Sequence, residues 1–441
     1  MIVIAIGWIL DPGAVTFALV ATSISGQTHH EKYHRFFSRG TWDPDELGRL
    51  IFIHLLGWLE DGEKVRISVD DTLAEKTGEK VFGIDSHINA VRSTKKRKFF
   101  SFGHCWVFVT FQIPLPFCNR CWALPFLFRL YRNKKTCLRK NCDYKKKTEL
   151  ARELVELVVK WADGRPIELA GDSGYSCSTV LKGLLDRITC YGSMRPDAVI
   201  TALPDKEDNE QEKEKKGGAK KKGKNKRCGP KPKRGKKLQK PEELAKDESQ
   251  PWLTCIVDLN GKKTTVTYKD YFGQWYRACG FTLLHIVVVL VPKGKIPYRV
   301  FFSTNAELSV QEILSSYSWR WSIEVCFCEL KQYLGFADSS ARKKEAVLRT
   351  APFVALLYTI IVIWFVENEI YNTSLATPPV RPWYLHKKAL SFEDILRAAR
   401  RAIIPKPIFD LPLVINNLHN NPNIPMIPNF YPKEAVRNSE T

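Results

Sequence analysis

The sequence predicts a mixed α/β fold, in which a mixed sheet with flanking helices follows a helical N-terminal region. Three features predict this class. A segment with strand periodicity opens the pattern at 64–71, helical and extended segments alternate from 148 to 203, and several short extended segments precede a long helical one after 252. Strands followed by alternating helices and strands are typical of a sheet that helices cover.

The composition is that of a folded protein with a polyanionic partner. Hydrophobic residues make up 44% of the 441 positions, which excludes generic disorder, and the length suggests two or three domains. Lys and Arg number 68 against 47 Asp and Glu, a formal charge of +21. Residues 211–240 alone hold 15 basic and 2 acidic side chains, so the rest of the chain is only mildly basic. Such a balance favours nucleic acid as the partner.

Neither apolar segment of the chain predicts a membrane span. The longest apolar run, Phe353 to Val366, has 14 residues, whereas a membrane-spanning helix needs about 20. The N-terminal segment MIVIAIGWILDPGAV lacks the basic flank of a signal peptide and is interrupted by Asp11-Pro12. We therefore expect a cytoplasmic protein with no membrane partner.

Residues 1–62 are predicted to be helical. Asp43 can cap a helix, Pro44 suits its first turn, and Glu46 completes a capping box before the apolar run LGRLIFIHLLGWL. The segment Lys64–Asp71 then alternates apolar and polar side chains, as a strand does, and ends in two acids.

The later elements follow from the same two periodicities. Before residue 204 these are a strand at 103–113, a helix at 148–162, a strand at 166–170 that stops before Asp172, a helix near Ser178 and a strand at 198–203. The lysine-rich segment 205–247 cannot bury apolar surface, so we expect an extended or disordered loop. Strands follow at 252–259, 262–268, 282–291 and 298–302, then a long helix at 308–334 and a proline-rich tail, 367–441, with one basic helix at 391–403.

Polar side chains line one narrow stripe of the long helix. Tyr317, Arg320, Glu324 and Lys331 stand at offsets of 0, 3, 7 and 14 residues. At 3.6 residues per turn they fall within about 60° of one another. Two interpretations remain open: a solvated helix face with an Arg320–Glu324 ion pair, or a functional stripe.

The spacing Tyr317-x2-Arg320-x3-Glu324-x6-Lys331 resembles the signature around the third acid of bacterial insertion-sequence transposases of the DDE type. Other segments resemble the same family in the same order, among them KYHRFFSRGTWDPDELG, SVDDTLAEKTGEKVFG, GHCWVFV, LAGDSGYS and SMRPDAVI. The resemblance runs from about His30 to Val366.

This resemblance implies a ribonuclease-H-like catalytic domain formed by 63–203 and 308–366, interrupted by a mainly β insertion domain at 204–307. It implies Asp70, Asp172 and Glu324 as the catalytic, metal-binding acids, because carboxylate oxygens suit the two Mg²⁺ ions of phosphodiester transfer, with Mn²⁺ as a substitute. Asp70 would bridge the ions, and Asp172 and Glu324 would each hold one. Family members carry more helical DNA-binding sequence before the YHRFF segment, so residues 1–62 are interpreted as a truncated DNA-binding domain.

Two neighbouring acids compete for the first position of the triad. Adjacent strand residues face opposite sides, and Asp71 shares its side with Val65, Ile67 and Val69. Asp70 also matches the Asp-x-Thr pattern of the family. We therefore predict Asp70 as the metal ligand and expect Asp71 to hydrogen-bond locally.

The resemblance also implies DNA contacts. Tyr317, Arg320 and Lys331 would hold phosphate oxygens near the scissile bond, although Lys331 also fits an ordinary solvent-facing lysine. Trp275 lies in the predicted insertion domain, where relatives stack an aromatic ring on a flipped base; core packing is the alternative. The lysine run is predicted to be a nonspecific phosphate-binding arm, with a solvated linker as the alternative.

The predicted function is transposition. The chain would be an endonuclease and strand transferase, acting as a homodimer in a synaptic complex on double-stranded DNA with terminal inverted repeats and on target DNA, at the nucleoid. The alternatives are a catalytically silent DNA-binding descendant and a nuclease that never joins strands. The acid triad favours an enzyme over the silent descendant, but the residues do not separate a transposase from a nuclease.

Overall fold

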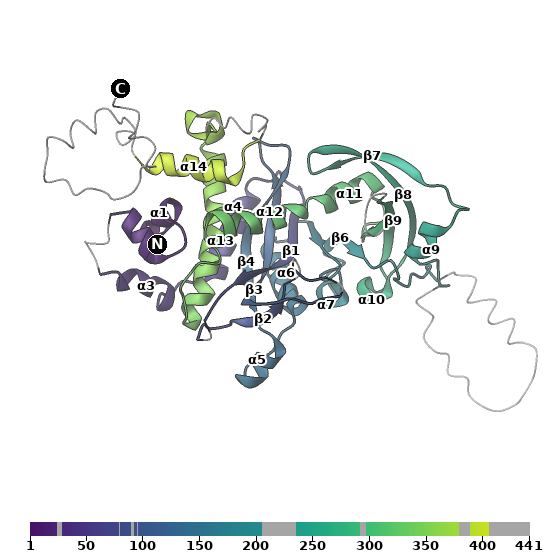
Figure 1. Cartoon of the computed structure of the whole chain (residues 1–441). Helices are drawn as coiled ribbons and strands as arrows, with labels where there is room; N and C mark the ends of the chain where they lie inside the picture. Colours follow the sequence, from purple (N-terminus) through teal and green to yellow (C-terminus); the bar gives the residue numbers. More distant parts are fainter. Residues whose placement is uncertain are drawn as a thin grey trace, which may run out of the picture.

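One mixed sheet runs through the centre of the protein (Figure 1). The computed structural model describes residues 1–23, 29–78, 80–89, 92–94, 96–204, 235–291, 297–378 and 389–404. Within these ranges ten strands are hydrogen-bonded in the order β2-β3-β1-β5-β6-β10-β9-β8-β7, and β4 pairs with β3. The mixed α/β prediction is therefore confirmed, and the sheet with its flanking helices is consistent with a ribonuclease-H-like fold.

The strands differ in direction along the sheet. β1, β5 and β6 are parallel to one another, and the other pairings are antiparallel. Their bounds are β1 Val65–Glu75, β2 Asp85–Ile88, β3 Phe100–Pro114, β4 Cys121–Tyr131, β5 Ile167–Gly171, β6 Ile188–Met194, β7 Leu253–Leu259, β8 Lys262–Gln274, β9 Leu283–Leu290 and β10 Tyr298–Ser303.

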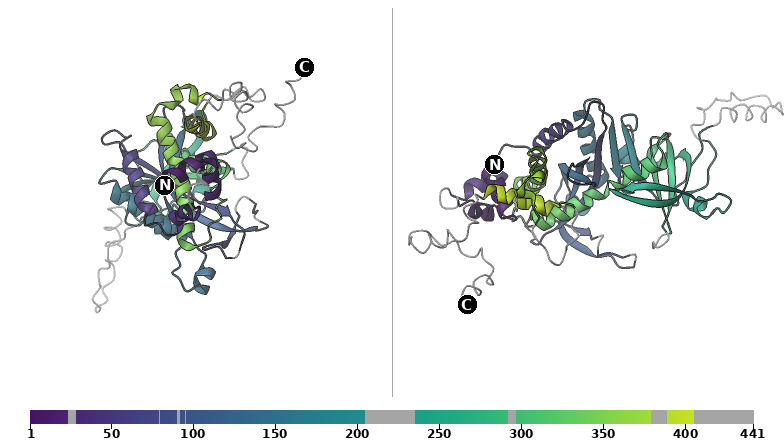
Figure 2. Two further views of the ribbon diagram at one scale, coloured as in Figure 1. Left: turned by 90° about the vertical axis from the view of Figure 1, so that its left-hand side faces the viewer. Right: turned by 90° about the horizontal axis from the view of Figure 1, so that it is seen from above.

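Helices cover the sheet and gather at one end of it. Their bounds are α1 Ile2–Leu10, α2 Val15–Ala21, α3 Glu31–Ser38, α4 Pro44–Leu56, α5 Lys134–Arg139, α6 Lys147–Trp161, α7 Ser178–Leu181, α9 Pro241–Lys246, α10 Tyr276–Cys279, α11 Val310–Ser318, α12 Trp321–Tyr333, α13 Lys344–Glu367 and α14 Phe392–Ile403, with short 3-10 turns at Ile370–Asn372 and Ser374–Ala376. Figure 2 shows α1 and α14 at the end of the molecule opposite β7 and β8.

The helical prediction for residues 1–62 is confirmed, with one difference at α4. Asp43 caps this helix by accepting a hydrogen bond from the Asp45 amide. The predicted capping box is not formed, because the Glu46 carboxylate accepts a hydrogen bond from Arg49 at 2.6 Å and not from the backbone amide of Asp43. At the other end of the region, the Trp8 Nε1 donates to the Leu334 carbonyl at 2.9 Å and so fixes α1 to the end of α12.

The apolar run at 353–366 belongs to helix α13, which the sequence analysis did not predict. α13 has 24 residues and is long and apolar enough to cross a membrane by length and composition. Two thirds (67%) of its most apolar window is nevertheless buried inside the protein. Its neighbours include β4, α3 and α4. We therefore interpret α13 as a core helix.

Three predicted elements differ in the structure. The first strand does not end at Asp71 but continues to Glu75, because β3 is long enough to pair with all of it. The helix predicted at 308–334 is two helices, which break at Trp319 and Arg320. The strand predicted at 198–203 is wrong: only Thr201 forms isolated bridges there, and the strand beside β5 is β6.

Two predicted segments lie partly outside the described residues. Of the loop 205–247, residues 205–234 are not described, whereas 241–246 form α9, so the prediction of an unstructured loop is wrong for that part. Of the tail, 405–441 is not described, and the basic helix predicted at 391–403 is confirmed as α14. β7 to β10 continue the central sheet through β6, and the predicted domain boundaries stay a prediction.

Candidate active site

Two of the predicted acids stand side by side where parallel pairing ends. β1 and β5 pair from Val65 opposite Ile167 to Val69 opposite Gly171. Asp70 and Asp172 are the next residue on each strand. The Asp172 carboxylate accepts hydrogen bonds from the amides of Gly174 (2.8 Å) and Tyr175 (3.0 Å), which fix the turn after β5. The fold therefore brings both carboxylates to the place where the parallel pairing of β1 and β5 ends, in the middle of β1 and at the carboxyl end of β5.

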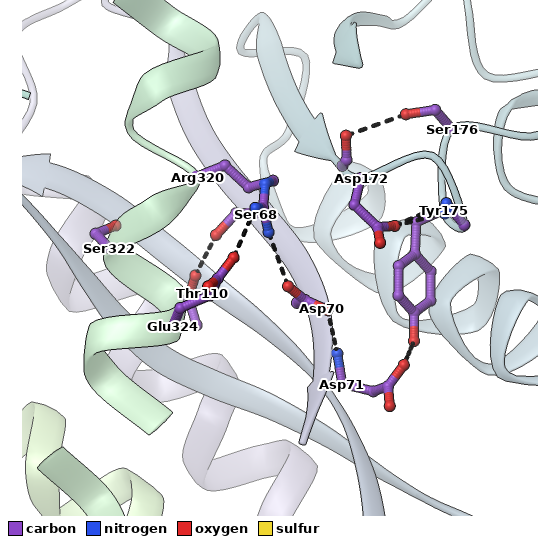
Figure 3. A network of polar contacts seen from close by, with 12 residues as sticks. Ser68, Asp70, Asp71, Thr110, Asp172, Tyr175, Ser176, Arg320, Ser322 and Glu324 are labelled. Carbon is purple, nitrogen blue, oxygen red and sulfur yellow. Dashed lines mark hydrogen bonds and ion pairs between the residues drawn. The ribbon is translucent and has the colours of Figure 1, made fainter. Parts of the chain in front are cut away.

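The third predicted acid, Glu324, is connected to Asp70 by the side chain of Arg320. Arg320 Nη1 donates to Asp70 Oδ2 at 2.9 Å, and Nη2 donates to Glu324 Oε1 at 2.6 Å (Figure 3). The side chains of Arg320 and Asp70 are only 14% and 18% exposed. The guanidinium thus joins a carboxylate of the central sheet to one of α12.

The break between α11 and α12 positions this arginine. Gln112 of β3 donates its Nε2 to the Trp319 carbonyl at 2.8 Å, and the Ser322 hydroxyl donates to the same carbonyl at 2.7 Å. Because side chains satisfy a carbonyl that an uninterrupted helix would have used, the chain can turn at this point. Arg320 then begins α12 with its side chain over β1.

Burial makes the Asp70 carboxyl hard to ionise. It raises the pKa of Asp70 to about 7; the Arg320 charge lowers this pKa, whereas the nearby Asp172 raises it. Because the Asp172 charge raises the pKa of Asp70, the two carboxylates lie close enough to interact electrostatically. Carboxylates that face each other in a partly buried site are stabilised by a cation.

Asp71 points away from this group and is fully engaged elsewhere. Its Oδ1 accepts from the Tyr175 hydroxyl at 2.7 Å, and its Oδ2 accepts from Lys147 Nζ at 2.6 Å and from the Cys105 thiol at 3.2 Å. The two sides predicted from strand alternation are therefore observed. The expectation of local hydrogen bonds is wrong, because these partners come from three other parts of the chain.

The charges around Asp71 stabilise one another. Burial lowers the pKa of Lys147, but the neighbouring Cys105 and Asp71 outweigh burial and hold that pKa above its ordinary value. Burial and the Asp71 carboxylate raise the pKa of Cys105 to about 12, so this thiol stays protonated at neutral pH. Burial and Asp71 likewise raise the pKa of the Tyr175 hydroxyl. Lys147 therefore neutralises Asp71, and both hydroxyl and thiol act as donors.

The predicted DNA-contacting residues occupy different surroundings. Tyr317 packs on Phe301 at 4.8 Å between ring centroids, and the Arg320 guanidinium lies 5.8 Å from its ring. Lys331 is partly buried, which lowers its pKa, so it is not a freely solvated lysine. Trp275 packs against Phe302 at 5.6 Å in the main core, as the core-packing alternative has it.

The donor chemistry of the three acids fits a hard divalent cation, although the carboxylates are not gathered. Among the residues described, no group of three or more His, Cys, Asp or Glu side chains converges closely enough to hold a metal ion. Asp70 and Asp172 are close enough to repel, and Glu324 is separated from Asp70 by the Arg320 guanidinium. Oxygen ligands of this kind suit Mg²⁺.

Two sequence families match the chain. The family described as DDE superfamily endonuclease matches residues 1–260, more than half of the chain, and the family described as archaeal putative transposase ISC1217 matches residues 281–377. The first match includes Asp70 and Asp172, and the second includes Glu324. No curated protein matches the chain.

Proposed function

The chain belongs to the DDE superfamily of endonucleases, and we propose that it is a transposase that cleaves DNA at the inverted-repeat ends of its own insertion sequence and joins these ends to target DNA. The observation that supports this proposal is the Arg320 guanidinium, which joins two of the three predicted acids, Asp70 and Glu324, close to the third, Asp172. Asp70 and Asp172 directly follow the last residues of the β1–β5 pairing, and Glu324 is joined to Asp70 through Arg320. The substrate would be double-stranded DNA, handled by a homodimer at the nucleoid in the cytoplasm.

The acids would hold two Mg²⁺ ions, or Mn²⁺ in their place. Asp70, Asp172 and Glu324 would supply the carboxylate oxygens that hold these ions. Bound there, the ions would stabilise the charge on the attacking and leaving oxygens of phosphodiester transfer. Asp71 would keep Asp70 in place, because its hydrogen bonds to Lys147 and Tyr175 fix the neighbouring strand residue.

The basic and phenolic side chains would bind the phosphates around the scissile bond. Arg320 Nε is buried and has no hydrogen-bond partner in the part of the chain that is described. A shift of the guanidinium on DNA binding would let this donor reach a phosphate oxygen. A guanidinium can hold phosphate through two parallel hydrogen bonds. Tyr317 lies beside it, and Lys331 follows on the same helix.

A plasmid that carries the inverted repeats tests this proposal. The wild-type protein should cut at the repeat ends in Mg²⁺, and Glu324→Gln should lower the cleavage rate at least about a thousandfold, because lost metal stabilisation is worth several kcal/mol. Binding of end DNA should survive. Glu345→Gln, which changes an exposed carboxylate in the first turn of α13, is the matched control and should cleave normally.

The outcomes separate the alternatives. Cleavage without joining to a second plasmid would indicate a nuclease, and DNA binding without any cleavage in the wild type would indicate a silent descendant. Near wild-type cleavage by Glu324→Gln at saturating Mg²⁺ would show that the assigned acids are not the active site.

A further inference from the structure

A large cleft opens beyond the acids, at the far end of β1. It has a volume of about 1410 Å³ and lies between the ends of β1 and β3, helix α5 and the segment before α13. Glu75 at the end of β1 pairs with Gly103, and Phe102 beside it lines the cleft. Asp70 stands five residues back on the same strand, about 17 Å away at 3.3 Å per residue. We call this space the β3–α5 cleft.

Cations dominate the exposed walls of the β3–α5 cleft. Lys135, Arg139 and Lys140 line it from α5 and its end, and Arg342 lines it from the segment before α13. The surrounding segment 132–147 has eight basic residues and one acidic residue. Among the described residues, the ion pairs within this segment are those of Lys145 with Glu153 and of Lys147 with Asp71. The α5 cations are therefore exposed without acidic partners.

The acids near these cations are mostly held by other groups. The Glu75 carboxylate accepts hydrogen bonds from the Asn89 amide (2.9 Å) and the Ser101 hydroxyl (3.1 Å). Asp85 is only 3% exposed and accepts from the Asn133 amide at 2.8 Å. The third acid that lines the cleft, Asp338, is exposed. Five cations against these three acids still leave the lining net positive, which favours a polyanion.

Exposed aromatic rings accompany the cations. Phe100 and Phe102 are 63% and 65% exposed, and they lie on the same face of β3 because they are two residues apart. Ile88, the cross-strand partner of Phe100, is also exposed, at 54%. The residues directly before this face, 96–98, are all basic. Exposed apolar groups clustered in this way mark a binding surface.

We propose that the β3–α5 cleft binds a DNA strand with unpaired bases. The α5 cations and Arg342 contact its phosphates, and Phe102, with Phe100 beside it, stacks on a base. A basic groove with aromatic platforms is the design by which proteins bind single strands, whereas a duplex backbone needs the cations alone. The proposal deepens the proposed function: at 3.4 Å per nucleotide, the cleft lies about five nucleotides from the acids.

Binding measurements with the full-length protein in EDTA test the aromatic part of this proposal. The probes are a labelled oligothymidylate and a blunt duplex of equal length, followed by fluorescence anisotropy. The double variant Phe100→Ala/Phe102→Ala should bind the single strand about tenfold more weakly and the duplex less than twofold more weakly. Phe17→Ala, which removes a ring that is 51% exposed on α2, is the control and should bind both as the wild type does.

The cation part is tested by Arg139→Gln/Lys140→Gln. This variant should weaken binding of both probes and make the slope of log affinity against log salt shallower, because fewer counterions are released. Three results would each overturn the proposal. The phenylalanine variant could lose affinity equally for both probes, it could lose no affinity for either, or the wild-type protein could fail to bind the single strand. Since no step requires cleavage, failure here is distinct from failure of the plasmid assay.

Discussion

Replacing Asp71 by Asn should destabilise the fold while leaving cleavage measurable. The change removes the charge that pairs with Lys147 at 2.6 Å, and it leaves a partly buried ammonium opposite a neutral amide. Breaking a fully buried pair costs about 3–5 kcal/mol. Here the side chains of Lys147 and Asp71 are 35% and 24% exposed. We therefore expect the free energy of unfolding to fall by about 2 kcal/mol, discounted for solvent screening.

One further variant isolates a single partner of Asp71, and another serves as a control. Tyr175→Phe removes one hydrogen bond and leaves the ion pair intact, so it should cost about 1 kcal/mol. Glu153→Gln breaks the more exposed pair with Lys145, 51% and 35% exposed, and is the control that should cost less than about 1 kcal/mol. Urea unfolding followed by circular dichroism measures all three.

Cleavage by the same proteins separates stability from chemistry. Well below its unfolding temperature, Asp71→Asn should still cut plasmid DNA, because the pairing of β1 with β3 and β5 still holds Asp70 beside Asp172, and an asparagine oxygen can still accept from Tyr175. Asp70→Asn should abolish cutting. An Asp71→Asn protein as stable as the wild type within about 0.5 kcal/mol, or as inactive as Asp70→Asn while folded, would refute the reasoning.

Three other perturbations test separate parts of the molecule. Burial lowers the pKa of His104 to about 4, and its Nε2 is hydrogen-bonded to the Phe82 carbonyl. As the pH falls below about 6.5, the unfolded chain takes up a proton at this residue before the folded protein does, so the free energy of unfolding should fall by up to about 3 kcal/mol toward pH 4. Urea unfolding measures this loss, and His104→Gln should make the free energy of unfolding depend less on pH. Gly48→Ala would place a methyl group 2.0 Å from the Phe126 carbonyl, so it should push α4 off β4 and lower the thermal midpoint, whereas an unchanged midpoint would contradict this packing. Deletion of residues 213–234, which hold most of the lysine run but spare the bridge of Thr201, should leave the fold intact and make the salt dependence of DNA binding shallower; an unchanged slope would indicate a solvated linker.

Elements with a clear local pattern were predictable, and those shaped by distant partners were not. The strand at 166–170 and the helix at 148–162 are both observed, as β5 and α6. β4 was missed because it contains Pro125, which rarely fits a strand. The structure accommodates this proline at an irregularity, where the register of β3 shifts between Val109 and Thr110. The break before α12 has no proline or glycine to mark it and depends on Gln112 from β3.

The positions of the acids were predictable only where they depend on the local sequence pattern. Strand alternation separates Asp70 from Asp71 without any knowledge of the fold, since neighbours on a strand face opposite sides. The partners of each acid depend on the tertiary structure, because they are distant in sequence. Arg320 is 250 residues from Asp70, and Lys147 is 76 residues from Asp71. Helical spacing did indicate the Arg320–Glu324 pair, although the long helix that predicted it is interrupted.

The two neighbouring acids show how the fold can carry adjacent carboxylates on one strand. A carboxylate on the inner side must be paired or it destabilises the protein, and Asp71 is paired by an ammonium from α6 and a phenol from the turn after β5. Because that turn also begins with Asp172, the hydrogen bond from Tyr175 to Asp71 connects the turn to β1, which carries Asp70. Asp70 is thereby left with a partner from α12, Arg320, whose guanidinium also reaches Glu324. Asp71 thus fixes the strand, and Asp70, on the other side of β1, faces Arg320 and Asp172.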